Sequence, residues 1–96
     1  MRPSERLHAN RDALLAVASQ MRMSNVRVFG SVAQGSDTDG SDLDLLVDSP
    51  ADATLLDMVE LQSRLEAIVG CHVDVLTPED LPERFRDQVL KDAVPL

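Results

Sequence analysis

Asp42 and Asp44 are two acidic residues separated by a single leucine at the start of an apolar run. Side chains two positions apart on a β-strand point to the same face, with Cα atoms roughly 6.6 to 7 Å apart. Two carboxylates in this arrangement can share a hard cation such as Mg²⁺, which prefers oxygen ligands. They could also bridge two ions, because the paired ions of phosphoryl-transfer sites lie about 3.5 to 4 Å apart. The pair therefore indicates a metal site.

A third acid, Asp74, lies within a second apolar segment, CHVDVLT. A buried carboxylate without a partner is costly unless it meets a cation or several hydrogen-bond donors. We therefore expect Asp74 to complete the ligand set. His72 shares the predicted strand face with Asp74, and we interpret it as a surface or packing residue that merits a test.

Ten residues separate Gly30-Ser31 from Asp42, and a second glycine follows at Gly35. Glycine lets the backbone approach an anion closely. Consecutive backbone N–H groups and a serine hydroxyl can cradle phosphate oxygens. We find no His/Asp arrangement in the sequence that would support Ser31 as a nucleophile, so phosphate contact is its expected role.

The elements that must position these residues can be read from hydrophobic periodicity and helix-capping signals. We predict helices from about Ser4 to Met21, from Asp52 to Val69 and from Glu83 to Asp92, and strands at Val26–Phe29, Asp42–Val47 and His72–Leu76. Thr54 could cap the second helix if it starts late, and Gly70 should end it. The expected buried helix faces consist of Leu7, Leu14, Val17, Ala18, Met21, Leu55, Met58, Leu61, Leu65, Ile68 and Val69.

This order of elements predicts an α/β (α+β) fold with a small mixed β-sheet and helices packed on one face. The first two strands are joined by too many residues for a tight hairpin and too few for a helical crossover, so we expect them to be antiparallel. The second and third strands are separated by a full helix, which suits a parallel crossover.

Several charged residues outside the acidic triad are interpreted as solvent-facing. Asp37 and Asp39 belong to an acid-rich loop, Gln34 to Ser41, whose glycine position and flanking strands do not match an EF-hand. We therefore expect solvated loop acids. The same solvated role is expected of Arg6, Arg11 and Asp12 on the first helix and of Arg84, Arg86 and Lys91 on the last. At most one of the three basic residues on the last helix is expected to reach a phosphate, and the sequence does not indicate which.

Composition narrows the range of functions. With 96 residues, the chain is expected to form one domain, residues 1–96. The net charge of −8 should repel nucleic acid, whereas a nucleotide delivered with Mg²⁺ is compatible with it. No 18-residue apolar run and no signal-peptide core are present, so we expect no membrane insertion and a cytoplasmic location. Cys71 is the only cysteine and is expected to be a small buried side chain.

The spacing of Gly30-Ser31, ten residues, and Asp42-Leu43-Asp44, followed by Asp74, resembles the nucleotidyltransferases of the DNA polymerase beta superfamily. Among these, the chain is most similar to the minimal ones, the MNT-domain antitoxins. The resemblance implies a polymerase-beta-like nucleotidyltransferase fold and ATP as the nucleotide donor. It also implies two Mg²⁺ ions held by three catalytic aspartates, Asp42, Asp44 and Asp74, and a nucleotide-binding set of Gly30, Ser31, Gln34 and Gly35.

The resemblance further implies the reaction: transfer of AMP from ATP to a tyrosine of a partner HEPN-type ribonuclease toxin, which neutralises the toxin in a hetero-oligomer. Two alternatives are a non-catalytic antitoxin that acts by occlusion and nucleotidyl transfer to a small molecule. Relatives that modify small molecules usually carry a further helical domain for the acceptor, so a protein substrate is expected. Where the family pattern usually has arginine, this chain has Gln34, which is a neutral donor and acceptor.

Overall fold

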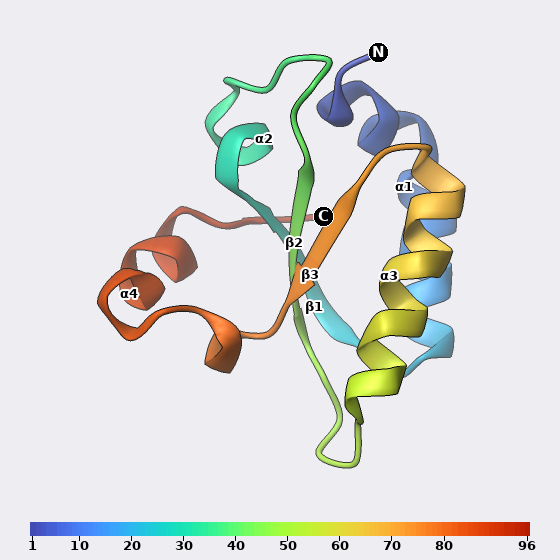
Figure 1. Cartoon of the computed structure of the whole chain (residues 1–96), viewed down its shortest axis with the longest axis vertical. Coiled ribbons are helices and arrows are strands. Elements are labelled where there is room, and N and C mark those ends of the chain that lie inside the picture. Colours follow the sequence, from blue (N-terminus) through green and yellow to red (C-terminus); the bar gives the residue numbers. More distant parts are fainter.

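The computed structural model describes residues 1–96 and contains helices on both sides of a four-stranded sheet (Figure 1). The helices are α1 (Pro3–Gln20), α2 (Gly30–Gln34), α3 (Leu55–Val69) and α4 (Glu83–Asp92), with a 3₁₀ turn, η1 (Pro78–Asp80), before α4. The strands are β1 (Ser24–Phe29), β2 (Leu43–Asp48), β3 (Val73–Leu76) and β4 (Val94–Pro95). None of the helices is both long enough and apolar enough to cross a lipid bilayer.

The strand order is β3-β2-β1-β4. β1 pairs with β2 in antiparallel fashion, and β2 pairs with β3 in parallel fashion, so both predicted pairings are confirmed. β4 was not predicted. It is two residues long, pairs antiparallel with β1, and is extended by a hydrogen bond from the Leu96 N–H to the Val26 carbonyl at 3.0 Å.

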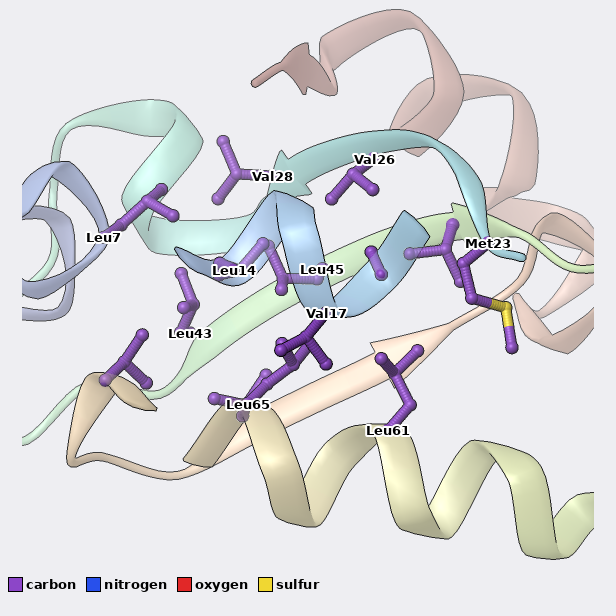
Figure 2. Close-up of a cluster of buried hydrophobic side chains, with 14 residues drawn as sticks. Leu7, Leu14, Val17, Met23, Val26, Val28, Leu43, Leu45, Leu61 and Leu65 are labelled. Atoms are coloured by element: carbon purple, nitrogen blue, oxygen red, sulfur yellow. The ribbon is translucent and has the colours of Figure 1, made fainter. Parts of the chain in front are cut away.

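The hydrophobic core lies between the sheet and the α1–α3 pair, which packs on one face of it (Figures 1 and 2). Leu14 of α1 and Leu61 of α3 are fully buried, and they belong to the same core cluster as the fully buried Leu43 and Leu45 of β2. By contrast, α4 lies on the other side of the strands in Figure 1 and contributes no buried side chain. The predicted combination of helices and a small mixed sheet is confirmed.

The ends of α3 are set by local hydrogen bonds. The Asp57 N–H donates to Thr54 Oγ1 at 3.2 Å, and the Thr54 N–H donates to Asp57 Oδ2 at 2.9 Å. This reciprocal capping box starts the helix at the later of the two predicted positions. Gly70 ends it with φ of +77°. One predicted face residue was assigned wrongly: Leu55 lies in the first turn of α3 and is 80% exposed.

Arg6 does not face solvent as predicted. Its Nη1 donates to the carbonyl of Val69 at 3.1 Å and so satisfies one of the last carbonyls of α3. Arg86 was also assigned wrongly to a solvated face. It donates to the carbonyls of Pro78 at 2.9 Å and Leu81 at 3.0 Å, which ties α4 to η1. Both guanidinium groups therefore have structural roles.

Asp37 is buried, with 6% of its surface exposed, which contradicts the prediction of a solvated loop acid. Its Oδ2 accepts a hydrogen bond of 2.9 Å from the backbone N–H of Ser4. The amides of a helix's first turn have no partner within the helix, so the carboxylate supplies one. This hydrogen bond lowers the pKa of Asp37 and joins the loop to the start of α1.

Candidate active site

Three neighbouring strands bring the acidic residues together at one end of the sheet. β1 ends at Phe29, which pairs with Asp44 near the start of β2. Asp44 in turn pairs with Asp74 at the start of β3. Asp44 therefore lies between the end of β1 and the start of β3, and the parallel pairing places Asp44 and Asp74 side by side.

Alternation along the strands decides which way these carboxylates point. Leu43 pairs with Val73, and both side chains are fully buried in the core. Successive strand side chains point to opposite faces, so Asp44 and Asp74 point away from α1 and α3. Both aspartates are only partly buried. The acidic site therefore lies on the face of the sheet that α1 and α3 leave open.

Asp42, His72 and Asp74 each offer a ligand atom, and these three atoms all lie within 4.8 Å of one another. Asp42 stands directly before β2 and not in it, because the strand begins at Leu43. The Leu43 N–H donates to the carbonyl of His72 at 3.0 Å, which holds the two segments together. Of the three predicted ligands, Asp42 and Asp74 are thus brought together, and Asp44 of the predicted pair lies beside Asp74 on the neighbouring strand.

Asp74 differs from its predicted environment. It was expected to be buried and therefore to require a partner, but its side chain is 44% exposed, and its Oδ1 lies 2.9 Å from His72 Nε2. β3 is an edge strand, so one side of Asp74 remains open to solvent. The hydrogen bond to Asp74 is the main cause that raises the pKa of His72.

Asp44 carries the strongest electrostatic perturbation in the site. Burial, followed by the negative charges of Asp74 and Asp42, raises the pKa of Asp44 to about 6, and His72 opposes this only in part. The carboxylates therefore repel one another. A divalent cation would relieve this repulsion, and carboxylate oxygens are the donors that Mg²⁺ prefers. The residues present fit such an ion.

Gly30 is needed for the approach of β1 to Asp44. Its φ is +70°, and a Cβ at this position would overlap Asp44 Oδ2. Gly35 ends α2 with a similar φ of +73°, but nothing lies within 4 Å of where its Cβ would be. The two predicted phosphate-loop glycines thus differ: Gly30 is constrained by the acidic site and Gly35 by backbone conformation alone.

The nucleotide-binding candidates lie on α2, a five-residue helix that was not predicted. Ser31 follows Gly30 directly in its first turn and is partly buried. Gln34 is exposed and borders a cavity of about 150 Å³ that is also lined by Gly30 and by Gln88 and Asp92 of α4. A larger cavity, about 550 Å³, lies between α3 and the end of β3 and contains none of the three aspartates.

Two further residues lie at the site: Glu66, which the sequence did not single out, and His72, which was interpreted as a surface or packing residue that merits a test. Glu66 Oε2 lies 2.8 Å from His72 Nδ1 and accepts a hydrogen bond of 3.0 Å from the Val73 N–H. The two-residue spacing of His72 and Asp74 indicated a shared face. No comparable signal pointed to Glu66, which reaches the site from the end of α3.

Comparison with known proteins agrees with this geometry. A family model described as nucleotidyltransferase domain matches residues 12–96. A Methanocaldococcus jannaschii protein assigned as a protein adenylyltransferase is 39% identical over 67 residues, which span 70% of this chain and 72% of the relative. Protein adenylyltransferase MntA of Thermococcus cleftensis is 36% identical over 69 residues, which span 72% and 70% of the two chains.

Solved structures show the same fold. A structure assigned as a minimal nucleotidyltransferase superposes with a TM-score of 0.86 and 44% identity, covering 97% of this chain and 95% of the other. A toxin–antitoxin structure with AMP-PNP shares the fold, with a TM-score of 0.77, 19% identity and coverage of 90% and 71%. The chain belongs to the nucleotidyltransferase family and is a nucleotidyltransferase, so the resemblance seen in its Gly-Ser and Asp-x-Asp spacing is confirmed.

Proposed function

We propose that this chain is a Mg²⁺-dependent protein adenylyltransferase. It transfers AMP from ATP to a tyrosine of a partner HEPN-type ribonuclease toxin and thereby neutralises it. The observation that carries the proposal is the convergence of Asp42, Asp44 and Asp74 beside Gly30. The names of the relatives and the toxin–antitoxin neighbour with AMP-PNP support the choice of nucleotide and acceptor.

In this proposal the three aspartates hold two Mg²⁺ ions. When bound, the ions neutralise the triphosphate and stabilise the charge that develops during in-line displacement. Asp42 and Asp74 offer oxygens within 4.8 Å of each other, and Asp44 lies beside Asp74 on the neighbouring strand. Their mutual repulsion in the absence of a cation is the electrostatic reason to expect ion binding.

The remaining residues of the proposed site handle the nucleotide. Gly30 and Gly35 allow positive φ angles, and with Ser31 they form the turn that contacts the triphosphate. Gln34 contacts the same nucleotide through its neutral amide. The exposed position of Gln34 beside Gly30 and α4 makes it accessible to a ligand.

The proposed reaction is a substitution at the α-phosphorus of ATP. The tyrosine oxygen forms a bond to the α-phosphorus, the bond to the β-phosphate bridge oxygen breaks, and pyrophosphate leaves. Asp74 accepts the proton of the tyrosine hydroxyl through a carboxylate oxygen. The AMP adds a negative phosphate and a bulky nucleoside to the toxin, which would exclude RNA by charge and size.

A binding-only antitoxin is the second candidate, because the chain carries a surface suited to protein contact. Leu55, Leu56 and Val59, here called the α3 patch, are 80%, 78% and 55% exposed. Clustered exposed apolar side chains mark interaction surfaces. Occlusion of a partner by such a surface would need no chemistry.

An experiment with Asp74→Asn separates the two candidates. The proposed HEPN-type partner toxin is mixed with wild-type protein, the variant, or a matched control, Asp87→Asn, an exposed acid on α4. Each mixture contains Mg²⁺ and ATP, and the toxin is then separated and tested for mass and ribonuclease activity. Asparagine has nearly the same shape as aspartate but carries no charge, so Asp74→Asn should still bind the toxin but should no longer transfer AMP to it.

We expect wild-type protein and Asp87→Asn to leave the toxin heavier by whole AMP units and inactive. Asp74→Asn should leave it unmodified and active after separation. If the wild-type mixture yields an unmodified toxin that is inhibited only while bound, occlusion replaces adenylylation as the function.

A further inference from the structure

The ring of His72 is held between two carboxylates. Its Nδ1 lies 2.8 Å from Glu66 Oε2, and its Nε2 lies 2.9 Å from Asp74 Oδ1. Glu66 is itself held by the Val73 N–H, which donates to the same Oε2 at 3.0 Å. These contacts fix the orientation of the imidazole and direct Nε2 toward the acidic cluster.

This arrangement is the one that metal-binding histidines use. A ligating histidine presents one ring nitrogen to the ion and donates the other N–H to a carboxylate, which sets the tautomer and the ring orientation. Here the carboxylate is Glu66, and Nε2 lies within 4.8 Å of ligand atoms of both Asp42 and Asp74. We propose that His72 is a direct ligand of the divalent cation through Nε2 and that Glu66 is its positioning residue.

The spacing of the donors is compatible with one ion. Adjacent ligands of an octahedral ion with bonds of 2.0–2.1 Å are about 2.9 Å apart. The separation of His72 Nε2 and Asp74 Oδ1 is 2.9 Å, so both can ligate without movement of β3. An ordinary hydrogen bond has the same length, and the Glu66 contact is therefore the observation that favours a ligand role for His72.

A nitrogen ligand changes which ions the site prefers. Carboxylate oxygens suit Mg²⁺, whereas imidazole favours first-row transition metals. Three aspartates alone would form a site for hard cations. The inference rests on the metal dependence in the proposed function and adds an expectation: the site should accept Mn²⁺, and His72 should raise its affinity for Mn²⁺ more than its affinity for Mg²⁺.

Pulsed electron paramagnetic resonance of Mn²⁺ bound to the full chain tests the ligand directly. A coordinated imidazole nitrogen produces ¹⁴N coupling, which carboxylates and water do not. The matched control is His8→Ala, because His8 is the only other histidine and is exposed on α1. Wild-type protein and His8→Ala should show the coupling of one imidazole, and His72→Ala should lack it. Persistence of the coupling in His72→Ala would overturn the assignment.

Two variants test Glu66 as the positioning residue, with circular dichroism as the check on folding. Loss of a partner carboxylate typically lowers metal affinity about 10- to 100-fold. Glu66→Ala should therefore weaken Mn²⁺ binding by roughly this factor and reduce the ¹⁴N coupling. Glu66→Gln keeps a hydrogen-bond acceptor and should lose less affinity while retaining the coupling at saturation. If every folded Glu66 variant binds Mn²⁺ with wild-type affinity, Glu66 is not the positioning residue.

The same measurements distinguish failure of this inference from failure of the proposed function. If wild-type protein binds neither Mn²⁺ nor Mg²⁺, both fail. If it binds Mn²⁺ and transfers AMP but shows no ¹⁴N coupling, the metal-dependent function stands and only the role of His72 is wrong.

Discussion

Replacing Asp44 by asparagine should stabilise the metal-free protein at pH 7.5 and should do so to a clearly smaller extent near pH 4.5. Burial and the charges of Asp74 and Asp42 raise the pKa of Asp44 from 3.8 to about 6 in the folded chain. The folded state therefore binds the proton more tightly than the unfolded state. The stability that this proton provides is present below about pH 4 and is lost as the pH rises through 6. Asparagine carries no titrating charge and avoids this loss.

The size of the effect follows from the pKa difference. A rise of about two pKa units corresponds to about 3 kcal/mol at most, because each unit is worth 1.36 kcal/mol. Asp44 is only partly buried, so solvent screening reduces this value, and we expect about 1 to 2 kcal/mol. For a chain of this size, each kcal/mol shifts the thermal midpoint by roughly 4 to 8 °C.

Urea unfolding of both proteins at pH 4.5 and 7.5, in the presence of a chelator, measures the effect. Asp87→Asn is the control for loss of one negative charge on the surface. Added Mg²⁺ at pH 7.5 should stabilise wild-type protein more than Asp44→Asn. The advantage of Asp44→Asn in free energy of unfolding should therefore shrink or change sign. A less stable Asp44→Asn protein in chelator at pH 7.5 would contradict this role of the Asp44 charge, as would a difference in unfolding free energy between the two proteins that does not change with pH.

Three further predictions concern the glycines, Gln34 and the acidic pair. Gly30→Ala and Gly35→Ala should each lower the free energy of unfolding by about 1 to 2 kcal/mol, because alanine is strained at positive φ. The loss should be larger for Gly30→Ala, because its Cβ would overlap Asp44, and equal losses in urea unfolding would contradict this contact. Gln34→Arg should strengthen ATP binding through a charge-assisted contact of about 1.5 to 3 kcal/mol; if ATP affinity and AMP transfer both stay unchanged, the side chain points away from the phosphates. Joint replacement of Asp42 and Asp44 by asparagine should weaken Mg²⁺-ATP binding in calorimetry while the fold persists, and unchanged affinity would exclude them as ligands.

Much of the fold could be predicted because its signals are local. The predicted bounds of α4, Glu83 to Asp92, match the structure, and α3 starts after its Thr54 cap and ends at Gly70. The missed elements lack such signals. α2 is only five residues long, too short for a hydrophobic period, and β4 exists only through its pairing with β1, a contact between distant parts of the chain. The burial of Asp37 likewise depends on a distant partner, the Ser4 N–H.

The candidate site was predictable to the extent that strand pairing aligns residues. Two apolar segments separated by one helix form adjacent parallel strands, and their register places Asp44 opposite Asp74. Sequence could not show that Asp74 is half-exposed, because the exposure results from its position on an edge strand. Nor could it show that Glu66 reaches His72, since that contact depends on where α3 ends relative to β3. The ligand and catalytic roles of these residues stay predictions.

The pleat of β2 explains how the sheet tolerates a cluster of repelling carboxylates. Leu43 and Leu45 are fully buried in the core on one face, while Asp44 between them points to the other. Each fully buried leucine contributes about 1.5 to 3 kcal/mol, so the two together exceed the screened cost of the Asp44 charge. A shift of one residue would place the carboxylate in the core, so the register of the strand is strongly specified. Burial of the two leucines therefore holds Asp44 next to Asp74, and the repulsion that remains is what a bound cation would remove.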